Sequence, residues 1–548
     1  DMQRHNSAIL DYFREWLYRR ARAETVTEFR LSELATTDNQ SFRFVLSRYG
    51  VKTLMGILPE VSRHYGTLKN LIGGEWVESH SSKIADVTNP ATGEVIAHLP
   101  ASTTNEALAA VHAAQKGFEE WSRVPLRERA KLLFDLRQRF EEDFDVLCRV
   151  LTQDHGRTIA ESRGSVRRCI ENIESACSAA YGLAQRNEHI DSLANGIDMW
   201  LTWEPLGPFL IVTPGNIPMH AWSSFVPYAL AAGCSVVISP SRQDPVAAEY
   251  INRTALKCGF PKGAINMVHG GREINKFILS QPEIQGLGFI GSTRAGAELF
   301  ELCGRLGKNS SINGNGKNHV VVMPDANLDQ GVIYLRQGCF GMTGQRCLGS
   351  DNVVVVGDIY DELKEKFIGI ARAMKLGYGL DESVTLGPYA TAAGRDKVEA
   401  WVELAVSEGA TIALDGRAAV PPDLKGGYFM GPTILENMHI DMKAAKEEAF
   451  GAVAGLIRAE KLDDVIEWIN TKTDLGHSAC ILTENGRAAR KFAREVNVGN
   501  VGINVGVPQP YAFFPLGSKR KSFMGGAKSR MASMRLFLDE KTVTARWG

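Results

Sequence analysis

The sequence lacks three features that would each narrow its class at once. It has no apolar run long enough for a membrane span, and its nine cysteines include no C-x-x-C pair. Its 62 basic and 63 acidic residues nearly cancel, leaving a formal net charge of −1. These absences argue against a membrane span, a disulfide framework, a zinc or other metal site and a nucleic-acid surface. Scattered cysteines favour a reducing compartment, either the cytoplasm or the mitochondrial matrix.

What remains is the composition of an ordinary globular protein, 44% hydrophobic and 23% charged over 548 residues. A chain of this length predicts roughly two to four domains. Residues 1–66 differ in style from the rest, with Ser7 placed to cap a helix that carries Ile9, Phe13 and Leu17 on one face. We expect a helical extension packed on the main body, with a docking arm for a protein or RNA as the alternative.

The main body alternates between strand-like and helix-like patterns. Strands are predicted at 209–213, 234–239, 265–269 and 286–290, and helices at 245–258, 275–281 and 293–306. This alternation predicts an α/β fold with a parallel sheet. Longer helices are predicted over 104–121, 126–153 and 159–183.

Three stretches are candidates for chemistry. Cys347 follows Arg346 in a glycine-rich segment, and a neighbouring cation favours the reactive thiolate, although most free cysteines are simply buried hydrophobes. Asn216 follows the strand at 209–213, where its amide can serve as an oxyanion donor or only as a turn residue. The turn G-S-T-R-A-G at 291–296 offers backbone N–H groups to a phosphate, but it is a weak dinucleotide signal.

Several motifs occur together and in a fixed order. They are T-P-G-N-I-P at 213–218, F-I-G-S-T-R-A-G at 289–296, G-K-N-H-V-V-V-M-P-D-A-N at 316–327, G-Q-R-C at 344–347, E-E-A-F-G at 447–451 and G-I-N-V-G-V-P-Q-P-Y-A-F-F-P at 502–515. From about Leu68 to its end, the chain resembles the aldehyde dehydrogenase superfamily. Within it, the chain is most similar to the coenzyme A-acylating methylmalonate-semialdehyde and malonate-semialdehyde dehydrogenases.

The resemblance implies a particular domain order. It places a Rossmann-type dinucleotide-binding domain at 67–185 and 206–315 and an α/β catalytic domain at 316–530. It also implies a small β oligomerisation hairpin built from 186–205 and 531–548, through which subunits exchange strands. We therefore expect a homodimer or a homotetramer.

The resemblance also implies roles for individual residues. Cys347 matches the nucleophile that forms a thiohemiacetal and, after hydride transfer to the nicotinamide, a thioacyl enzyme; Asn216 and the Cys347 backbone N–H match the oxyanion site. Arg168 and Arg346 match a pair that clamps the substrate carboxylate. Glu448 and Phe450 match the residues that hold the nicotinamide ribose and ring. The other cofactor-binding candidates are Thr213, Pro214, Ser239, Ser241, Arg242, Gly291 and Ser292.

Asn313 stands where hydrolytic members carry a water-activating Glu, so the acyl group is expected to leave as an acyl-CoA. In the family the β-carboxylate is then lost as bicarbonate, which gives propionyl-CoA or acetyl-CoA. The chain departs from the family pattern at Gly215, where the family has Phe, at Arg242, the end of S-P-S-R in place of K-P-S-E, and at Asn315, where the family has Gly. Gaining an arginine where an acid binds the ribose makes NADP an option beside NAD.

These features leave three hypotheses. The first is an active CoA-acylating semialdehyde dehydrogenase that uses NAD or NADP. The second is a scaffold or assembly subunit that keeps the fold with weakened cofactor binding. The third keeps the enzyme but changes its substrate, because Gly215 opens space near the acyl pocket. We prefer the first, since a scaffold gives no reason to keep a carboxylate clamp.

Overall fold

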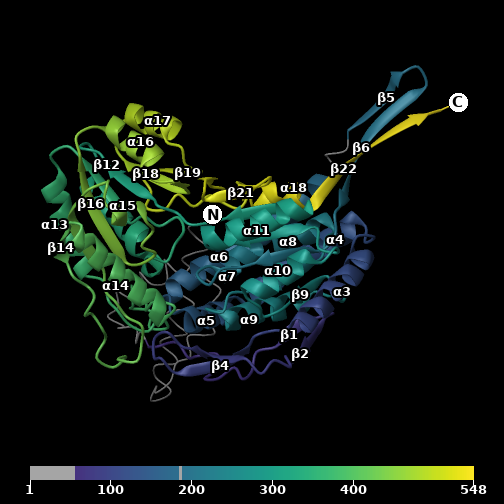
Figure 1. Ribbon diagram of the computed structural model, residues 1–548, viewed down its shortest axis with the longest axis horizontal. Helices are drawn as coiled ribbons and strands as arrows, with labels where there is room; N and C mark the ends of the chain where they lie inside the picture. Colours follow the sequence, from purple (N-terminus) through teal and green to yellow (C-terminus); the bar gives the residue numbers. More distant parts are fainter. Residues whose placement is uncertain (1–55, 184–187, 548) are drawn as a thin grey trace, which may run out of the picture. The chain divides into compact units, whose positions relative to one another are not determined.

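The computed structural model describes residues 56–183 and 188–547 of the chain. The helical extension predicted over residues 1–66 lies outside the described residues as far as residue 55, and over residues 56–66 the prediction is wrong, because these residues form no helix. From Ile57 onward the chain forms two large sheets and a three-stranded sheet that projects from the first of them (Figure 1). Within the described part of the chain, no helix is both long and apolar enough to cross a bilayer.

The first sheet has eight strands in the order β2-β1-β9-β8-β7-β10-β11-β21. Its strands are β1 (Asn70–Ile72), β2 (Glu75–Val77), β7 (Phe209–Val212), β8 (Val236–Ser239), β9 (Ile265–Met267), β10 (Gly286–Ile290), β11 (Asn309–Asn313) and β21 (Phe523–Gly525). The pairs from β9 to β11 are parallel, whereas β1, β2 and β21 pair antiparallel at the edges. The strands β7 to β10 are buried along their whole length, as in parallel sheets that helices cover on both faces.

The second sheet has seven strands in the order β14-β15-β16-β13-β12-β18-β19, and only β14 runs antiparallel. Its strands are β12 (His319–Val322), β13 (Asn352–Val356), β14 (Thr411–Leu414), β15 (Thr433–Met438), β16 (Val453–Ala459), β18 (Ser478–Leu482) and β19 (Asn500–Ile503). Alternate residues of β13 enter two different cores: Val353 and Val355 pack on one face and Val354 and Val356 on the other. This period of two is what a sheet covered on both faces requires.

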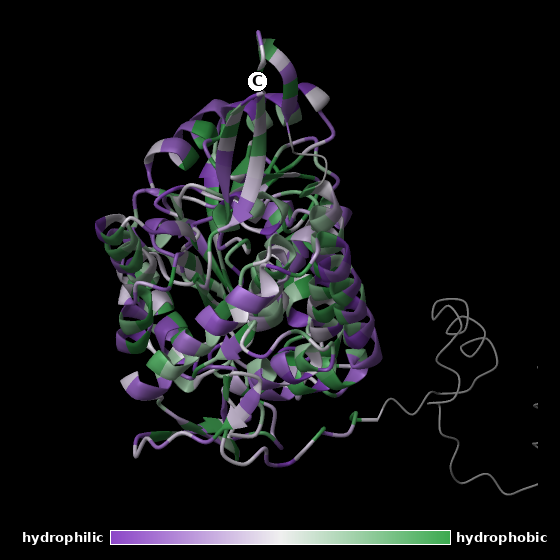
Figure 2. Ribbon diagram, turned by 90° about the vertical axis from the view of Figure 1, so that its right-hand side faces the viewer, coloured by the Kyte–Doolittle hydropathy of each residue, from purple (hydrophilic) through white to green (hydrophobic). Residues whose placement is uncertain are grey.

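The helices of the main body follow the sequence prediction closely, with one exception. Helix α3 (Thr104–Trp121) has its predicted bounds because Thr103 and Glu106 form a capping box. The single helix predicted over 126–153 is wrong, since the chain breaks at Asp143 into α4 (Leu126–Glu142) and α5 (Phe144–His155). The Asp143 carboxylate accepts hydrogen bonds from Thr254 Oγ1 at 2.6 Å and Lys257 Nζ at 2.5 Å, which fixes the break against α9 (Pro245–Leu256). Figure 2 shows that helices on the outside of the fold carry hydrophilic residues on their outer turns, with hydrophobic residues toward the interior.

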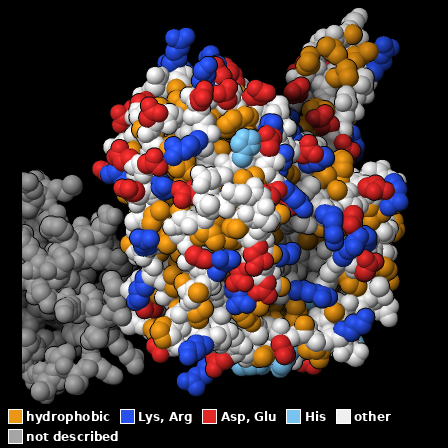
Figure 3. Space-filling view, turned by 60° about the vertical axis from the view of Figure 1, so that its left-hand side comes forward, with side chains coloured by type: hydrophobic (Ala, Val, Ile, Leu, Met, Phe, Trp, Pro, Cys, Tyr) orange, Lys and Arg blue, Asp and Glu red, His pale blue; other side chains and the backbone are white. Residues whose placement is uncertain are grey.

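The projecting sheet, here called the arm, consists of β5 (His189–Ala194), β6 (Ile197–Pro205) and β22 (Leu538–Arg546), with β6 in the middle and all pairs antiparallel. Large apolar side chains gather on it, and Figure 3 shows hydrophobic atoms on its surface. Ile190, Leu193 and Trp547 are 53%, 52% and 63% exposed.

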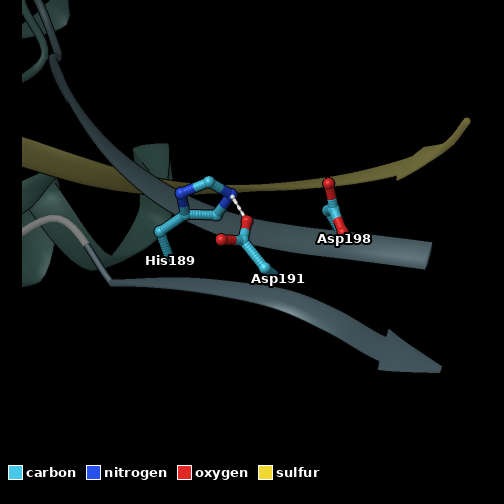
Figure 4. Close-up of side chains that lie close together, drawn as sticks. All are labelled: His189, Asp191 and Asp198. Atoms are coloured by element: carbon cyan, nitrogen blue, oxygen red, sulfur yellow. Dashed lines mark ion pairs between the residues drawn. The ribbon is translucent and has the colours of Figure 1, made fainter. Parts of the chain in front are cut away.

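The arm also carries three neighbouring side chains of types that can bind a metal ion: His189, Asp191 and Asp198, drawn in Figure 4. His189 Nε2 lies 3.1 Å from Asp191 Oδ1, whereas Asp198 accepts from the Ser192 N–H at 2.8 Å and from Trp547 Nε1 at 2.5 Å. These contacts tie the two strands and the chain end together. They account for the cluster as part of the hairpin structure.

Candidate active site

Cys347 lies just after a strained turn. In the 3₁₀ segment Gly341–Gly344, Met342 and Thr343 both have positive φ, 54° and 55°. Consecutive non-glycine residues in this region persist only where neighbouring groups hold them. Glu161 of α6 (Ile159–Gly182) does so, because its Oε1 accepts a hydrogen bond from the Met342 N–H at 2.6 Å. The approach to Cys347 is therefore fixed by a residue far away in the sequence.

Three motifs interlock around Cys347. Gly344 has φ of 68°, and an added Cβ there would overlap the carbonyl oxygen of Gly451 in E-E-A-F-G. A Cβ on Gly316 would lie 2.5 Å from the Cys347 carbonyl oxygen. Asn318 Nδ2 donates to that same carbonyl at 2.8 Å. The sequence shows G-K-N-H as a motif, but nothing in it marks Asn318 as the residue that positions the cysteine backbone.

Asn216 lies next to this loop, as predicted. It follows β7, and its Nδ2 donates to the carbonyl of Gln345 at 2.9 Å, two residues before Cys347. Arg157, which is fully buried, donates through Nη2 to the Asn216 carbonyl. The amide thus lies beside the cysteine loop, but Asn216 does not line the cavity at Cys347, and its role as an oxyanion donor stays a prediction.

Gly215 does not face the acyl pocket, so this expectation is wrong. An added Cβ would overlap Gln243 and lie 3.0 Å from Ser241 Oγ, on the side of the cofactor candidates. Gly215 is not among the residues that line the cavity at Cys347. Its small size therefore makes room for the loop after β8 rather than for a substrate.

A cavity of about 630 Å³ opens beside Cys347 and contains both predicted carboxylate-binding residues, Arg168 and Arg346. Arg168 Nη1 donates to Glu171 at 2.6 Å, and its guanidinium lies 4.7 Å from the centre of the Tyr511 ring. Arg346 Nε instead donates to a thioether, Met342 Sδ, at 3.2 Å. Arg346 forms no ion pair among the described residues; burial lowers its pKa, and the nearby carboxylate of Glu161 offsets part of this.

A further arginine, which sequence reasoning missed, lies behind this cavity. Arg530 is fully buried with φ of 64°, and its Nη2 lies 2.8 Å from Nε2 of His220, a residue that lines the cavity. Burial and the charges of Arg530, Arg168, Arg346 and Arg157 lower the pKa of His220 well below its ordinary value. Among the described residues, only Arg168 of these four arginines forms an ion pair. This end of the cavity is therefore cationic. The contribution of Arg530 can be seen only in the folded structure, where this residue is buried against His220.

The charge state of Cys347 differs from the sequence expectation. Burial raises the pKa of its thiol to about 12, with a further rise from the carboxylate of Glu448, and Arg346 offsets this only slightly. Arg346 lowers the pKa of Cys347, the direction expected from the sequence, but burial outweighs it in the free protein. The other eight cysteines are buried, whereas Cys347 is only partly so.

Glu448 is already engaged in this structure. Its Oε1 accepts from the Gly316 N–H at 3.0 Å, and its Oε2 accepts from Asn315 Nδ2. Asn315 also accepts from the Thr293 N–H at 2.7 Å, so it connects Glu448 to the start of α11 (Thr293–Leu306). Burial raises the pKa of Glu448 to about 7.

Phe450 lies in the same loop, with a positive φ of 54°. The loop is held by Asp351, whose Oδ2 accepts from the Ala449 N–H at 2.9 Å and pairs with buried Lys317 at 2.9 Å. Neither Phe450 nor Glu448 lines the cavity at Cys347.

A second cavity, of about 250 Å³, lies at the carboxyl ends of β7, β8 and β10. It collects six of the predicted cofactor residues, namely Thr213, Pro214, Ser239, Ser241, Arg242 and Gly291. Ser292 does not line it; instead its Oγ caps α11 by accepting from the Ala295 N–H at 3.3 Å. A crevice at the carboxyl end of a parallel sheet, beside a helix N-terminus, fits a dinucleotide.

A profile of the aldehyde dehydrogenase family matches residues 76–543. The chain belongs to the aldehyde dehydrogenase family. This aldehyde dehydrogenase is 38% identical over 484 residues to malonate-semialdehyde dehydrogenase 1 of Geobacillus thermodenitrificans, covering 88% of this chain and 99% of the relative. The fold class and the resemblance drawn from the sequence are confirmed.

Two solved structures are similar throughout. The crystal structure of methylmalonate-semialdehyde dehydrogenase from Oceanimonas doudoroffii matches with a TM-score of 0.86 and 33% identity, covering 88% of this chain and 99% of that one. An NAD-dependent aldehyde dehydrogenase from Sinorhizobium meliloti matches with a TM-score of 0.83 and 26% identity, covering 88% and 95%. The chain is an aldehyde dehydrogenase that uses a nicotinamide cofactor.

Proposed function

We propose that this aldehyde dehydrogenase converts a carboxylated semialdehyde, malonate or methylmalonate semialdehyde, to acetyl-CoA or propionyl-CoA, with coenzyme A as the acyl acceptor. The observation that carries the proposal is the cationic cavity at Cys347, in which Arg346 has no ion-pair partner among the described residues. A planar guanidinium fork suits a carboxylate. The names of the similar enzymes agree with this substrate class.

Each of the site residues has its own role in the proposed reaction. Arg168 and Arg346 hold the carboxylate, which places the aldehyde carbon near the Cys347 sulfur. The Cys347 thiol loses its proton to solvent and the sulfur then attacks that carbon, and the Asn216 amide with the Cys347 N–H stabilises the resulting oxyanion. When bound, the nicotinamide accepts the hydride from that carbon. The acyl group then remains on Cys347 as a thioester.

Release to coenzyme A rather than to water is supported by the carboxylates of the cavity. Glu161 accepts from the backbone N–H groups of Met342 and Thr158, and Glu382 pairs with Arg163 at 2.7 Å, so both are engaged. Asn313 is buried at the end of β11, and an amide cannot act as a general base. Water needs such a base, whereas a thiol ionises far more readily. The acyl group leaves as its CoA thioester, and the β-carboxylate is lost as bicarbonate.

The test is turnover of malonate semialdehyde with and without coenzyme A, with the products identified by mass spectrometry. We expect acetyl-CoA and reduction of the cofactor only when coenzyme A is present. Free malonate as the main product would contradict the acylating function while leaving the dehydrogenase intact. Absence of any turnover, with the fold intact by circular dichroism, would favour a scaffold role.

We further propose that the two large sheets have different roles, with β21 of the first sheet contributed by the catalytic range. We assign 67–185 and 206–315 to cofactor binding, 316–530 to catalysis, and the arm, 186–205 with 531–548, to assembly. The relatives named above are bacterial, so a mitochondrial location gains no support.

We also propose that the arm joins copies of this chain into a homodimer or homotetramer. Its edge strand β5 and the exposed side chains of Ile190 and Leu193 support this. Light scattering after size exclusion should give a smaller mass for Ile190→Lys with Leu193→Lys. The control Val420→Lys, at a residue 41% exposed outside the arm, should keep the native mass.

A further inference from the structure

The cofactor cleft carries positive charge at the position where a ribose is recognised, and this charge suits a nucleotide phosphate. In doubly wound sheets, a residue after the second strand distinguishes the two dinucleotides: an acid accepts from a ribose 2′-hydroxyl, whereas an arginine meets a 2′-phosphate. Here β7 is the first strand and β8 the second, and Ser241 and Arg242 follow β8 into the 250 Å³ cavity.

Arg242 is exposed, and its bonding leaves most of its donors available. Its Nε donates to the carbonyl of Gly270 at 3.2 Å, which orients the guanidinium along the cleft wall. An added Cβ on Gly271 would lie 3.4 Å from Arg242 Nη2, so the guanidinium passes close to a residue without a side chain. Among the described residues, Nη1 and Nη2 of Arg242 have no hydrogen-bond or ion-pair partner.

The acid that a 2′-hydroxyl would need is not free. Glu298 is the carboxylate among the lining residues, and Arg272 binds it with two hydrogen bonds, of 2.7 and 2.6 Å. Lys276 Nζ lies 3.4 Å from the same carboxylate. Arg242, Arg272 and Lys276 against Glu298 leave the lining with an excess of positive charge.

From this geometry we infer that the enzyme is selective for NADP over NAD and that Arg242 is the residue that determines this selectivity. A 2′-phosphate would bring its two negative charges to the unpartnered end of the Arg242 guanidinium, with Lys276 and Arg272 on the same wall. The ribose 2′-hydroxyl of NAD would find no free carboxylate on this wall to accept its hydrogen bond. The inference rests on the proposed dehydrogenase function and adds the choice of cofactor.

The 3′-phosphate of coenzyme A has the same chemistry, so the test separates the two sources. Calorimetric titration of the full chain with NADP and NAD is paired with titration by adenosine 2′,5′-bisphosphate and adenosine 3′,5′-bisphosphate. We expect NADP to bind at least about tenfold more tightly than NAD, since the extra contacts are charge-assisted hydrogen bonds. We expect the 2′,5′-bisphosphate to bind more tightly than the 3′,5′-isomer.

Arg242→Gln should remove most of the NADP preference and leave NAD affinity within about twofold, because the lost donor faces the 2′-position only. The control Arg305→Gln removes the same charge from an exposed arginine at the far end of α11 and should leave the NADP to NAD ratio unchanged.

Equal or tighter binding of NAD would overturn the inference and leave the dehydrogenase function standing. Equal loss of both dinucleotides in Arg242→Gln would also overturn it, as would preference for the 3′,5′-isomer, which would assign the cleft to coenzyme A. Binding of neither dinucleotide would overturn the inference together with the proposed function.

Discussion

The two cavities of this enzyme use positive charge differently. At Cys347, guanidinium groups from α6 and the cysteine loop line the cavity and Arg530 lies buried behind His220, and only Arg168 among them is paired within the described residues. In the cofactor cleft the charge lies on an open wall, where Arg272 and Lys276 are partly neutralised by Glu298. Buried charge is costly unless it is compensated, so the first arrangement indicates an anionic substrate more strongly than the second indicates a phosphate.

The comparison also separates chemistry from cofactor choice. The loops that hold Cys347 and Glu448 adjoin the second sheet, whereas Arg242 follows a strand of the first. Changes at one place should therefore leave the other function measurable.

Cys347→Ser should abolish turnover, by about 10³-fold or more, because the alkoxide needed for attack forms far less readily than a thiolate. Reduction of the cofactor followed at 340 nm gives the rate. Titration with NADP is the control and should be unchanged if the two cavities are independent. Residual turnover close to the native rate would show that another group carries the acyl intermediate.

Arg346→Gln should raise KM for malonate semialdehyde by roughly 10- to 100-fold, since it removes a charge-assisted contact to the substrate carboxylate. Propionaldehyde, which has no carboxylate, should show little change in KM. Arg167→Gln, on α6 but paired with Glu141, is the matched control and should behave like the native enzyme. A similar rise for both aldehydes would point to damaged packing instead of a lost clamp.

Asn315→Gly should tighten binding of NADP and NAD alike by about three- to tenfold. The change releases Glu448 from the Asn315 amide and the start of α11, so the carboxylate becomes available to a ribose. Calorimetry measures both affinities. Unequal effects on the two cofactors would mean that Asn315 acts near the 2′-position, and weaker binding would mean that it contacts the cofactor directly.

Alkylation by iodoacetamide should occur at Cys347 in preference to the eight buried cysteines, and its rate in the free enzyme should keep rising with pH through pH 9. The thiol pKa is raised, so the thiolate fraction increases tenfold per pH unit below it. Glu448→Gln removes a nearby negative charge, lowers the pKa of Cys347 and should speed alkylation by about two- to tenfold at pH 8.

A rate that levels off near neutral pH would show a thiolate stabilised by Arg346. Peptide mapping by mass spectrometry identifies the alkylated cysteine. Glu447→Gln, one residue earlier in the same loop and exposed, is the matched control for the effect of Glu448.

Sequence reasoning succeeded where local pattern decides structure. The alternation of strands and helices, the capped helix at 104–121 and the motifs around Cys347 depend on residues close together in the chain. It failed where distant residues decide. The break at Asp143 depends on Thr254 and Lys257, and the direction of Gly215 depends on the loop after β8.

The site shows the same limit. Arg346 belongs to the G-Q-R-C motif, Arg168 matches a family position, and both reach one cavity. Arg530 lies in a segment without a motif, and only its burial against His220 reveals it. The raised pKa of Cys347 follows from desolvation by burial. The identity of the neighbouring residue in the sequence does not predict this burial.

The most direct test of the proposed mechanism is a pre-steady-state burst experiment with excess malonate semialdehyde and NADP but no coenzyme A. We predict that reduced cofactor forms in a burst of about one equivalent per Cys347 and then stops, because the thioacyl enzyme has no general base for water. Adding coenzyme A should restart turnover at once. Continued turnover without coenzyme A would contradict the account, since it would show that this enzyme hydrolyses its own acyl intermediate.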